Sequence, residues 1–247
     1  MKNIFRIITI TLLFVQSSIV HGQINFTNGG GDKLFSNAAN WSTGKVPTAA
    51  DKIKLDTNGD TIIVDGVYSV RQILATKVKG AFIGNGGNDT LYINGNSGIG
   101  QPIQANGTDA RVAFHLPVVL ETTVGTQTKS FATNGGGSHI KFFDVFINHS
   151  MHLSLSNPNN RANTQIHFDG KFISTKWLNI NANAKVEFGP NSDFTEHKSA
   201  VRFIGNAGNG QLTVKSAKDK FKTSDTKIWV NTGGTFNANS ELSLIHI

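Results

Sequence analysis

Short runs in which apolar and polar residues alternate recur along the chain from position 52 to its last residue. Most runs are about three to six residues long, a length typical of strands, and Gly, Asn, Asp, Ser or Pro bounds them. In residues 52–55, for example, Ile53 and Leu55 share one face and the two lysines share the other. The pattern predicts about twenty strands and almost no helix.

The same alternation predicts which side chains fill the core, because every second residue of a strand points to the same face. We expect the interior to be supplied by Ile83, Leu91, Ile93, Phe114, Ile166, Phe168, Ile180, Phe188, Phe203 and Val214. Between them, outward residues are available for contacts, and the clearest are Tyr92, His115, His167 and Trp229.

About twenty short strands in one chain fit a sandwich, a barrel or a stack of coils. Two features favour the stack. The strands recur about every ten residues, so two or three of them make a coil of about 20–30 residues. In addition, residues 82–88 (FIGNGGN) are echoed by residues 203–209 (FIGNAGN), and a strand follows each copy. We therefore predict an all-β fold, a parallel β-helix (solenoid), with a β-sandwich as the alternative.

A distinctive segment precedes the first clear strand. Trp41 can cover the open end of a β core, and Gly44 and Pro47 mark a turn. The residues of interest are Asn40, Trp41, Gly44, Val46, Pro47, Asp51, Ile53 and Leu55. This pattern resembles the first segment of secreted bacterial parallel β-helix surface proteins, which include autotransporter-passenger-like and adhesin-like proteins. The resemblance implies a right-handed β-helix and a surface location, and it implies no catalytic residue.

The N-terminus has the features of a secretory signal. Lys2 and Arg6 precede an apolar run, and Val20-His21-Gly22 offers a small-residue cleavage site. We expect residues 1–22 to be a signal peptide and residues 23–247 to form the β-helix domain. The chain has no cysteine, which excludes a disulfide framework. An exported, cysteine-free chain is typical of a bacterial protein that is secreted or held at the cell surface.

The composition and charge of the chain limit the classes of binding partner that we expect. Charged residues make up 16% of the chain, below the roughly 25% of typical soluble domains, and the net charge is +7. The positive residues are scattered, so we expect polysaccharides or cell-envelope glycans as partners and no nucleic acid. The apolar run of the leader is shorter than the ~18 residues that a membrane helix needs, so no membrane span is expected.

One region has the residue types that bind or cleave polysaccharides. Acidic residues occur at Asp169, Glu187, Asp193 and Glu196. The candidate carbohydrate-binding residues beside them are Arg161, Lys171, Lys176 and Trp177. Glycoside hydrolysis needs two carboxylates about 5–10 Å apart, and lyase chemistry needs a base near a cation. Residues on successive coils can meet either geometry, but the bland explanation is a solvated polar face, and no catalytic residue is assigned.

Two turns contain oxygen ligands at spacings seen in calcium sites. Residues 56–60 (DTNGD) place oxygen donors at alternate positions, with Asp65 as a further ligand, and residues 84–91 resemble a glycine-rich calcium repeat. Tight, glycine-rich turns are the better explanation of both segments. The histidines His139, His149, His152 and His167 lack the spacing of a metal site. We expect no cofactor and no metal centre, with Ca²⁺ as the exception that these turns leave open.

These patterns favour a non-enzymatic, secreted or cell-surface β-solenoid that acts as a structural or adhesive module and contacts glycans. The alternative is a polysaccharide-degrading β-helix enzyme, a lyase or a glycoside hydrolase. The two differ in what one outward face should hold. An enzyme should concentrate carboxylates, arginines and aromatic residues on a single face, and a stalk should not.

The C-terminus generates a first testable prediction. Residues 241–247 alternate apolar residues up to the last one, so Leu242 and Leu244 should face inward on an uncapped coil. An uncapped coil exposes unpaired backbone groups and an apolar cross-section, which favours end-to-end association. We expect the 247-residue chain to be truncated and to associate in light scattering, and a chain extended by its downstream sequence to be monomeric. A monodisperse 247-residue chain of equal stability would favour the sandwich.

Overall fold

The computed structural model describes residues 22–94, 102–107, 109–120, 129–134, 139–147, 153–156, 164–174, 178–180, 184–193, 195, 201–203, 211–217, 220, 228–229 and 235–238. Within these residues the chain is all-β, and the helical structure is confined to the 3-10 turn η1 (Ala38–Asn40). The strands are β1 (Gln23–Asn25), β2 (Lys52–Leu55), β3 (Asp60–Val64), β4 (Val67–Val70), β5 (Gln72–Thr76), β6 (Lys79–Gly84), β7 (Thr90–Ile93), β8 (Ile103–Asn106), β9 (Arg111–Leu120), β10 (Lys129–Asn134), β11 (His139–Ile147), β12 (Leu153–Ser156), β13 (Thr164–Phe168), β14 (Phe172–Ser174), β15 (Leu178–Ile180), β16 (Ala184–Phe188), β17 (Val201–Phe203), β18 (Gln211–Val214), β19 (Ile228–Trp229) and β20 (Thr235–Ala238). The expected signal peptide lies outside the described residues.

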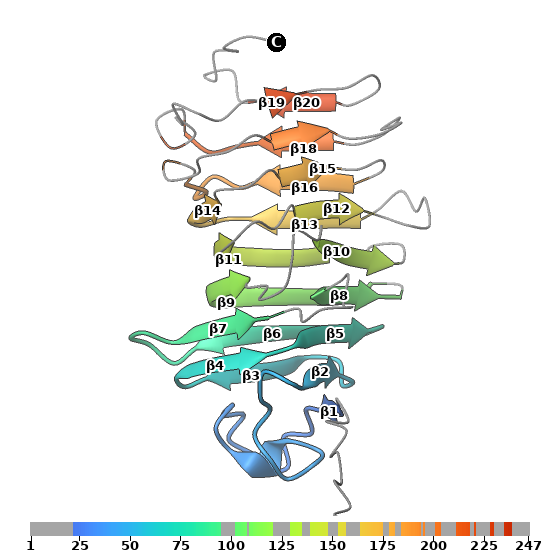
Figure 1. The fold of residues 1–247 in the computed structure, drawn as a ribbon, viewed down its shortest axis with the longest axis vertical. Helices are drawn as coiled ribbons and strands as arrows, with labels where there is room; N and C mark the ends of the chain where they lie inside the picture. The colour runs from blue at the N-terminus through green and yellow to red at the C-terminus, as the bar shows by residue number, and fades with distance from the viewer. Residues whose placement is uncertain are drawn as a thin grey trace, which may run out of the picture.

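The strands form two parallel sheets. The nine-stranded sheet has the order β1-β2-β5-β8-β10-β12-β15-β17-β19. The eleven-stranded sheet runs β3-β6-β9-β11-β13-β16-β18-β20, with β4, β7 and β14 paired beside this path. Both orders follow the chain, so each new strand is added at the same end of its sheet (Figure 1). Every pairing between the described strands is parallel, which is not the antiparallel arrangement expected of the alternative sandwich.

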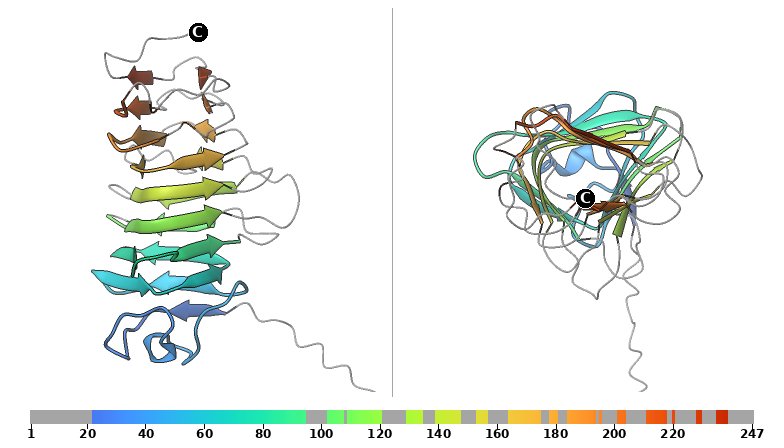
Figure 2. Two further views of the ribbon diagram at one scale, coloured as in Figure 1. Left: turned by 90° about the vertical axis from the view of Figure 1, so that its left-hand side faces the viewer. Right: turned by 90° about the horizontal axis from the view of Figure 1, so that it is seen from above.

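The register shows how far the chain travels before it returns to a sheet. Lys52 pairs with Gln72, and Ile73 pairs with Ile103 one strand further on. One return therefore takes about 20 to 30 residues, as the spacing of the strand runs predicts. From β8 onward the chain alternates between the two sheets, with β14 as an extra strand, and the strands rise along one long axis (Figures 1 and 2).

A column of phenylalanine rings fills the interior behind the eleven-stranded sheet. The rings come from successive strands, and each is at most 1% exposed: Phe82, Phe114, Phe142, Phe168 and Phe188. Neighbouring ring centroids are 5.1–5.5 Å apart. Among the first four rings, the planes of neighbouring rings differ by no more than 10°. In-register parallel pairing puts identical residues on top of one another at about the strand spacing, so the rings stack.

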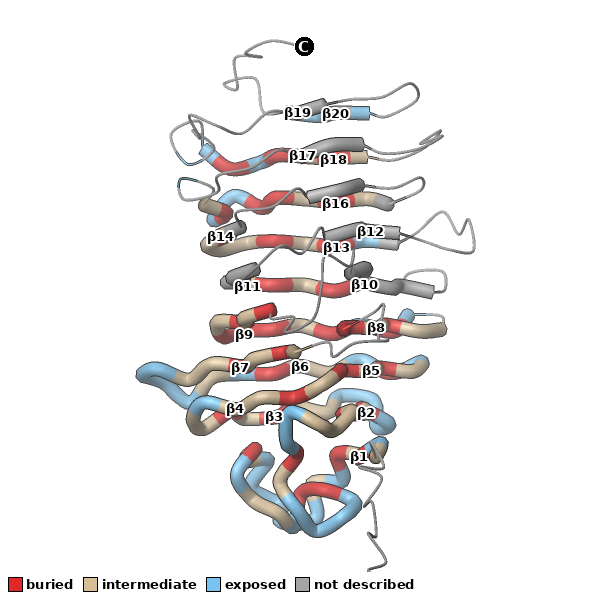
Figure 3. Tube along the Cα trace, viewed as in Figure 1, coloured by how far each residue is buried: buried red, intermediate tan, exposed pale blue. Residues whose placement is uncertain are grey.

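Seven of the ten predicted core residues are buried: Leu91, Ile93, Phe114, Ile166, Phe168, Phe188 and Val214. The side chains of Ile180 and Phe203 lie outside the described set. The prediction for Ile83 is wrong, because Ile83 is 38% exposed and Phe82 is fully buried instead. Buried and less buried residues alternate along strands such as β9 and β13 (Figure 3). Register explains the error: Phe82 pairs with Phe114, so its neighbour Ile83 must point outward with His115.

The sequence echo does not mark equivalent positions. The first copy begins at Phe82 in β6, which belongs to the eleven-stranded sheet, and leads to β7 in the same sheet. The second copy begins at Phe203 in β17, which belongs to the nine-stranded sheet. The shared letters therefore reflect similar strand-and-turn chemistry at two different places in the fold.

A close approach of the two sheets requires glycine at position 80. Its register partner on β9 is the buried Val112, so residue 80 belongs to an inward row. A Cβ atom at Gly80 would lie 2.6 Å from Cδ1 of Leu55, which comes from β2 of the other sheet. The glycine thus makes room for a leucine that closes the same layer of the core.

The segment before β2 covers the N-terminal end of the stack. Trp41 is 2% exposed, and its ring packs edge-on against Phe26 and Phe35 at centroid distances of 5.3 and 5.0 Å. Its indole Nε1 donates a 2.9 Å hydrogen bond to the carbonyl oxygen of Phe35. The expectation that Trp41 covers the end of the core is therefore confirmed, and its burial removes it as a ligand contact.

The same segment also pairs with the free edges of both sheets. Leu34 forms a parallel bridge with Ile63 of β3, and the Phe35 N–H donates to the Ile63 carbonyl at 2.8 Å. At the edge of the other sheet, β1 pairs with β2. The segment before β2 thus bonds the backbone of Ile63 at the edge of β3 and adds a strand beside β2, which leaves fewer unpaired backbone groups at the N-terminal end.

Two adjacent residues test this register. Phe82→Ala removes a fully buried ring from the column and should destabilise the chain by about 3–5 kcal/mol. Ile83→Ala changes a neighbour that points to solvent and should cost less than about 1 kcal/mol. Urea unfolding followed by circular dichroism measures both. An equal loss in the two variants would contradict the assignment of Phe82 to the core and Ile83 to the surface.

Candidate functional site

The outward face of the eleven-stranded sheet carries three parallel rows of side chains. The first row contains Lys79, Arg111, His139, Gln165, Lys185, Gln211 and Thr235. The middle row contains Thr61, Ala81, Ala113, Lys141, His167, Glu187, Thr213 and Asn237. The third row contains Ile83 and His115, paired in register, and then Phe143, whose ring stacks on the His115 ring at 4.2 Å. Register alone brings these distant residues together.

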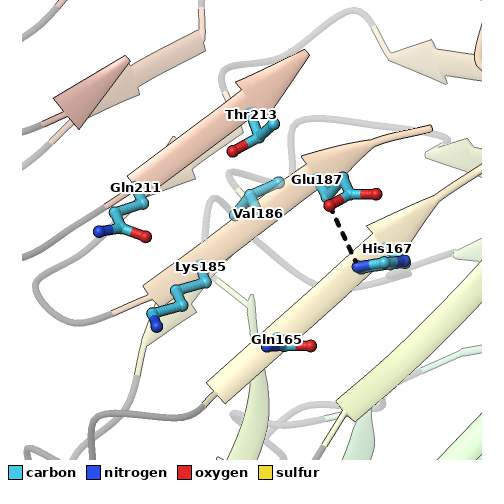
Figure 4. A pocket seen from close by; sticks show the side chains of 7 residues that line it. All are labelled: Gln165, His167, Lys185, Val186, Glu187, Gln211 and Thr213. Atoms are coloured by element: carbon cyan, nitrogen blue, oxygen red, sulfur yellow. Dashed lines mark ion pairs between the residues drawn. The ribbon is translucent and has the colours of Figure 1, made fainter. Parts of the chain in front are cut away.

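A polar hollow lies over β13, β16 and β18, and we call it the Glu187 pocket. It is lined by Gln165, His167, Lys185, Val186, Glu187, Gln211 and Thr213 (Figure 4). The Nε2 atom of His167 lies 3.7 Å from Oε2 of Glu187, and Nζ of Lys215 lies 2.9 Å from Oε1 of the same carboxylate. The pocket thus combines an imidazole, a paired carboxylate and several amide and hydroxyl groups that can bond sugar hydroxyls.

A second hollow lies over β3, β6, β9 and β11, and we call it the basic groove. Its floor includes the small residues Gly59, Gly80, Ala81 and Ala113. Its cationic residues and imidazole are Lys79, Arg111, His139 and Lys141, and Asp60 is the acidic residue of its lining. Small side chains in the middle row flanked by long basic ones make the groove, since the backbone beneath is a continuous sheet.

The electrostatics of this face keep two imidazoles neutral near neutral pH. Burial lowers the pKa of His167, the ammonium groups of Lys141 and Lys215 lower it further, and Glu187 opposes them only in part. Burial and then Lys141 lower the pKa of His115 as well. Both rings therefore act as uncharged groups: His115 offers an aromatic surface and His167 offers a hydrogen-bonding nitrogen.

Three of the four carboxylates named from the sequence form an ion pair with a lysine. Lys141 lies 3.6 Å from Asp169, and Lys215 lies 2.9 Å from Glu187. Lys220 lies 3.2 Å from Asp193, whose pKa is lowered by hydrogen bonds from the hydroxyl and N–H of Thr195 and by Lys220. Glu196 lies outside the described residues. The described carboxylates are thus spread over three ion pairs.

Of the four predicted carbohydrate-binding residues, Lys171 is described. It precedes β14 and forms a parallel bridge with Asp193, so it lies beside the Asp193 ion pair and belongs to none of the three rows. Arg161, Lys176 and Trp177 lie outside the described residues. The basic groove was not predicted. A basic residue or histidine three positions before a phenylalanine recurs at residues 79–82 (KGAF), 111–114 (RVAF) and 139–142 (HIKF), and this repeat could have revealed it.

The two expected calcium loops are hydrogen-bonded turns. In the first, Asp60 Oδ2 accepts the Thr57 N–H at 3.0 Å and Asn58 Oδ1 accepts the Lys79 N–H at 3.1 Å. The expected further ligand, Asp65, instead accepts from Ser36 and Tyr68. In the second loop, Asp89 Oδ2 accepts the Asn85 N–H at 2.6 Å. Calcium binding at these turns stays a prediction.

Neither a metal-ligand cluster nor a membrane-spanning helix occurs among the described residues. No three His, Asp or Glu side chains in that part of the chain gather as metal ligands. Nor does the described part contain a helix long and apolar enough to cross a membrane. In comparisons with known proteins, no family model, no curated protein and no solved structure matches the chain.

The neutral His167 generates a pH prediction. Its folded-state pKa lies below the unfolded value of about 6.5, so the unfolded chain binds more protons in mild acid. The stability that this group contributes is fully present above the unfolded pKa and is lost as the pH falls through the folded value. Between about pH 7.5 and about pH 5, His167→Gln should therefore lose less stability than the parent chain in urea unfolding.

Thr213→Val is the matched control, because it changes the same pocket and leaves the imidazole in place. It should show the same loss of stability with pH as the parent chain. If His167→Gln and the parent chain fall in parallel, the imidazole is not held neutral by its surroundings.

Proposed function

We propose that residues 23–247 form a right-handed parallel β-helix, a solenoid in which each coil covers the one before it. Support comes from two sheets that both follow chain order and from parallel, in-register pairing along each. Similar return lengths and an interior column of stacked rings are what repeated coils produce. The right-handed sense is that of about 98% of connections between parallel strands of one sheet.

We propose further that the protein is a secreted or cell-surface structural or adhesive module of a bacterium, and that it contacts glycans. The leader-like N-terminus and the absence of cysteine support export. Phenylalanine and aliphatic side chains fill the space between the sheets, so a ligand must bind to the outer surface of the sheets. The outward face of the eleven-stranded sheet offers rows of amide, hydroxyl, imidazole and charged groups for this purpose.

One observation carries this proposal: polar side chains from strands far apart in sequence continue in line along the sheet. The middle row alone includes Thr61, Lys141, His167, Glu187 and Thr213. A polymer of sugars has a repeating set of hydroxyl groups, and such a row can meet it at several successive units. Several weak contacts along one chain then add up to useful affinity.

The environment of His167 supports the enzyme as an alternative function. His167 is neutral, and in the Glu187 pocket it lies beside a carboxylate and near Lys185. A neutral imidazole can accept a proton, and a nearby cation can neutralise an acidic sugar, which are the two requirements of a polysaccharide lyase. We favour the binding module because Glu187 is already engaged by Lys215.

The experiment separates binding from turnover. The purified chain is incubated with a panel of neutral and acidic polysaccharides, and both the bound fraction and the release of new chain ends are followed. We expect saturable binding with no product. Product formation that His167→Gln abolishes and Lys52→Gln, on the nine-stranded sheet, preserves would instead establish the enzyme. Failure to bind any polysaccharide of the panel would contradict the glycan-contacting module.

A further inference from the structure

We propose that the basic groove, together with the aromatic row beside it, is a binding site for an anionic polysaccharide that lies along the long axis of the stack. The inference rests on the proposed glycan contact and names both the class of sugar and the place. The site is built from β6, β9 and β11. It lies nearer the N-terminal end of the sheet than Glu187, and its last strand, β11, borders the region that the sequence first suggested.

Three residues from each of the three strands form a regular surface. The first row contributes Lys79, Arg111 and His139. The middle row contributes Ala81, Ala113 and Lys141. The third row contributes Ile83, His115 and Phe143. Since side chains two residues apart on a strand are separated by about 6.7 Å, a floor lies between one charged wall and one apolar wall.

The charged wall can bind acidic groups at regular intervals. Lys79, Arg111 and His139 occupy successive strands, so their backbones are about 4.8 Å apart along the stack. Lys79 and Arg111 are exposed. A guanidinium group such as that of Arg111 can bind a carboxylate or a sulfate through paired N–H groups. Lys141 adds a further cation on the side of β11. A polymer that carries one acid per sugar presents its charges in the same repeating manner.

The acids near this wall do not close it. Asp109 lies 3.9 Å from Arg111, and Asp169 lies 3.6 Å from Lys141. Both side chains of the Arg111–Asp109 pair are exposed, so this pair is weak, at most about 1 kcal/mol, and a ligand carboxylate can replace Asp109. Asp169 is 14% exposed and stays with Lys141 at the far side of the groove. Asp60, in the groove lining, accepts the N–H of Thr57 and so belongs to its own turn.

The opposite wall suits the apolar face of a sugar ring. His115 and Phe143 stack at 4.2 Å, and Ile83, 38% exposed, continues the same row. The ammonium group of Lys141 lies 4.7 Å above the Phe143 ring and holds that ring beside the floor. Because His115 is neutral, this wall attracts C–H groups and not anions. A sugar acid has both surfaces that the groove needs, an apolar ring face and a charged edge.

The small side chains in the floor of the groove leave room for a polymer to lie flat against the sheet. Ala81 and Ala113 occupy positions that hold Lys141, His167 and Glu187 on later strands. The hollow above them has a volume of about 330 Å³, which is in the range of small-ligand sites. A larger side chain at position 113 would fill the hollow without changing any charge.

The test uses five probes with the full chain: polygalacturonate, dextran sulfate, unsulfated dextran, poly-glutamate and a DNA duplex. We expect both acidic polysaccharides to bind, and we expect added salt to lower their affinity for the chain. Lys79→Gln/Arg111→Gln should lower their affinity at least about tenfold, and Ala113→Leu should do the same. The matched controls lie on the nine-stranded sheet. Lys52→Gln/Lys54→Gln removes the same charge, and Thr76→Leu adds similar bulk, so both should bind as the parent chain does.

The outcomes separate this inference from the proposed function. If unsulfated dextran binds and the acidic polymers do not, the glycan module stands and the anionic site is wrong. If poly-glutamate or a DNA duplex binds as tightly as polygalacturonate, the groove recognises charge and not sugar, and the inference is overturned. If the acidic polymers bind but the groove variants match the controls, the site is elsewhere. If none of the polysaccharides binds, the proposed function fails as well.

Discussion

The stacking of Phe82, Phe114, Phe142, Phe168 and Phe188 is the interaction on which the arrangement of the molecule depends. Each ring is buried, and each meets the next only if the strands pair in one register. A slip by one residue would turn every ring to solvent and bring a polar residue inside. Burial of one such side chain contributes about 1.5–3 kcal/mol, and ring stacking adds about 0.5–1.5 kcal/mol for each pair. The column therefore fixes the register of β6, β9, β11, β13 and β16, the central strands of the eleven-stranded sheet.

The outward rows follow from that register. Once Phe114 points inward, Ala113 and His115 must point outward, and the same holds on every strand of the column. The surface chemistry is consequently a property of the stack and not of any local motif. The N-terminal segment lets the stack begin: Trp41 covers the first core layer, and Leu34 bonds the edge of β3. Position along the stack then decides whether the middle row holds alanine, as in the basic groove, or the polar residues His167 and Glu187.

The sequence predicted more of the fold than of the site. Alternation in strands such as Lys52–Leu55 and Thr90–Ile93 was enough to assign faces, and Trp41 was correctly placed in the core. The error at Ile83 arose because both Phe82 and Ile83 are apolar, and only the partner Phe114 decides between them. The basic groove could not be found from any single stretch of sequence. Lys79, Arg111 and His139 lie side by side only through strand pairing, and the number of residues between one and the next differs. Aligning the phenylalanines as a repeat supplies the missing register.

The central claim, a single in-register stack, is tested most directly by distances between spin labels. The chain contains no cysteine, so pairs of introduced cysteines report only the chosen positions. One label replaces Lys79, and the second replaces Lys185, Gln211 or Thr235 in the same row. The account predicts that the label distance increases by about 5 Å with each further strand, although each step adds more than twenty residues of sequence. Distances that do not rise evenly, or that shorten from Gln211 to Thr235, would contradict the stack.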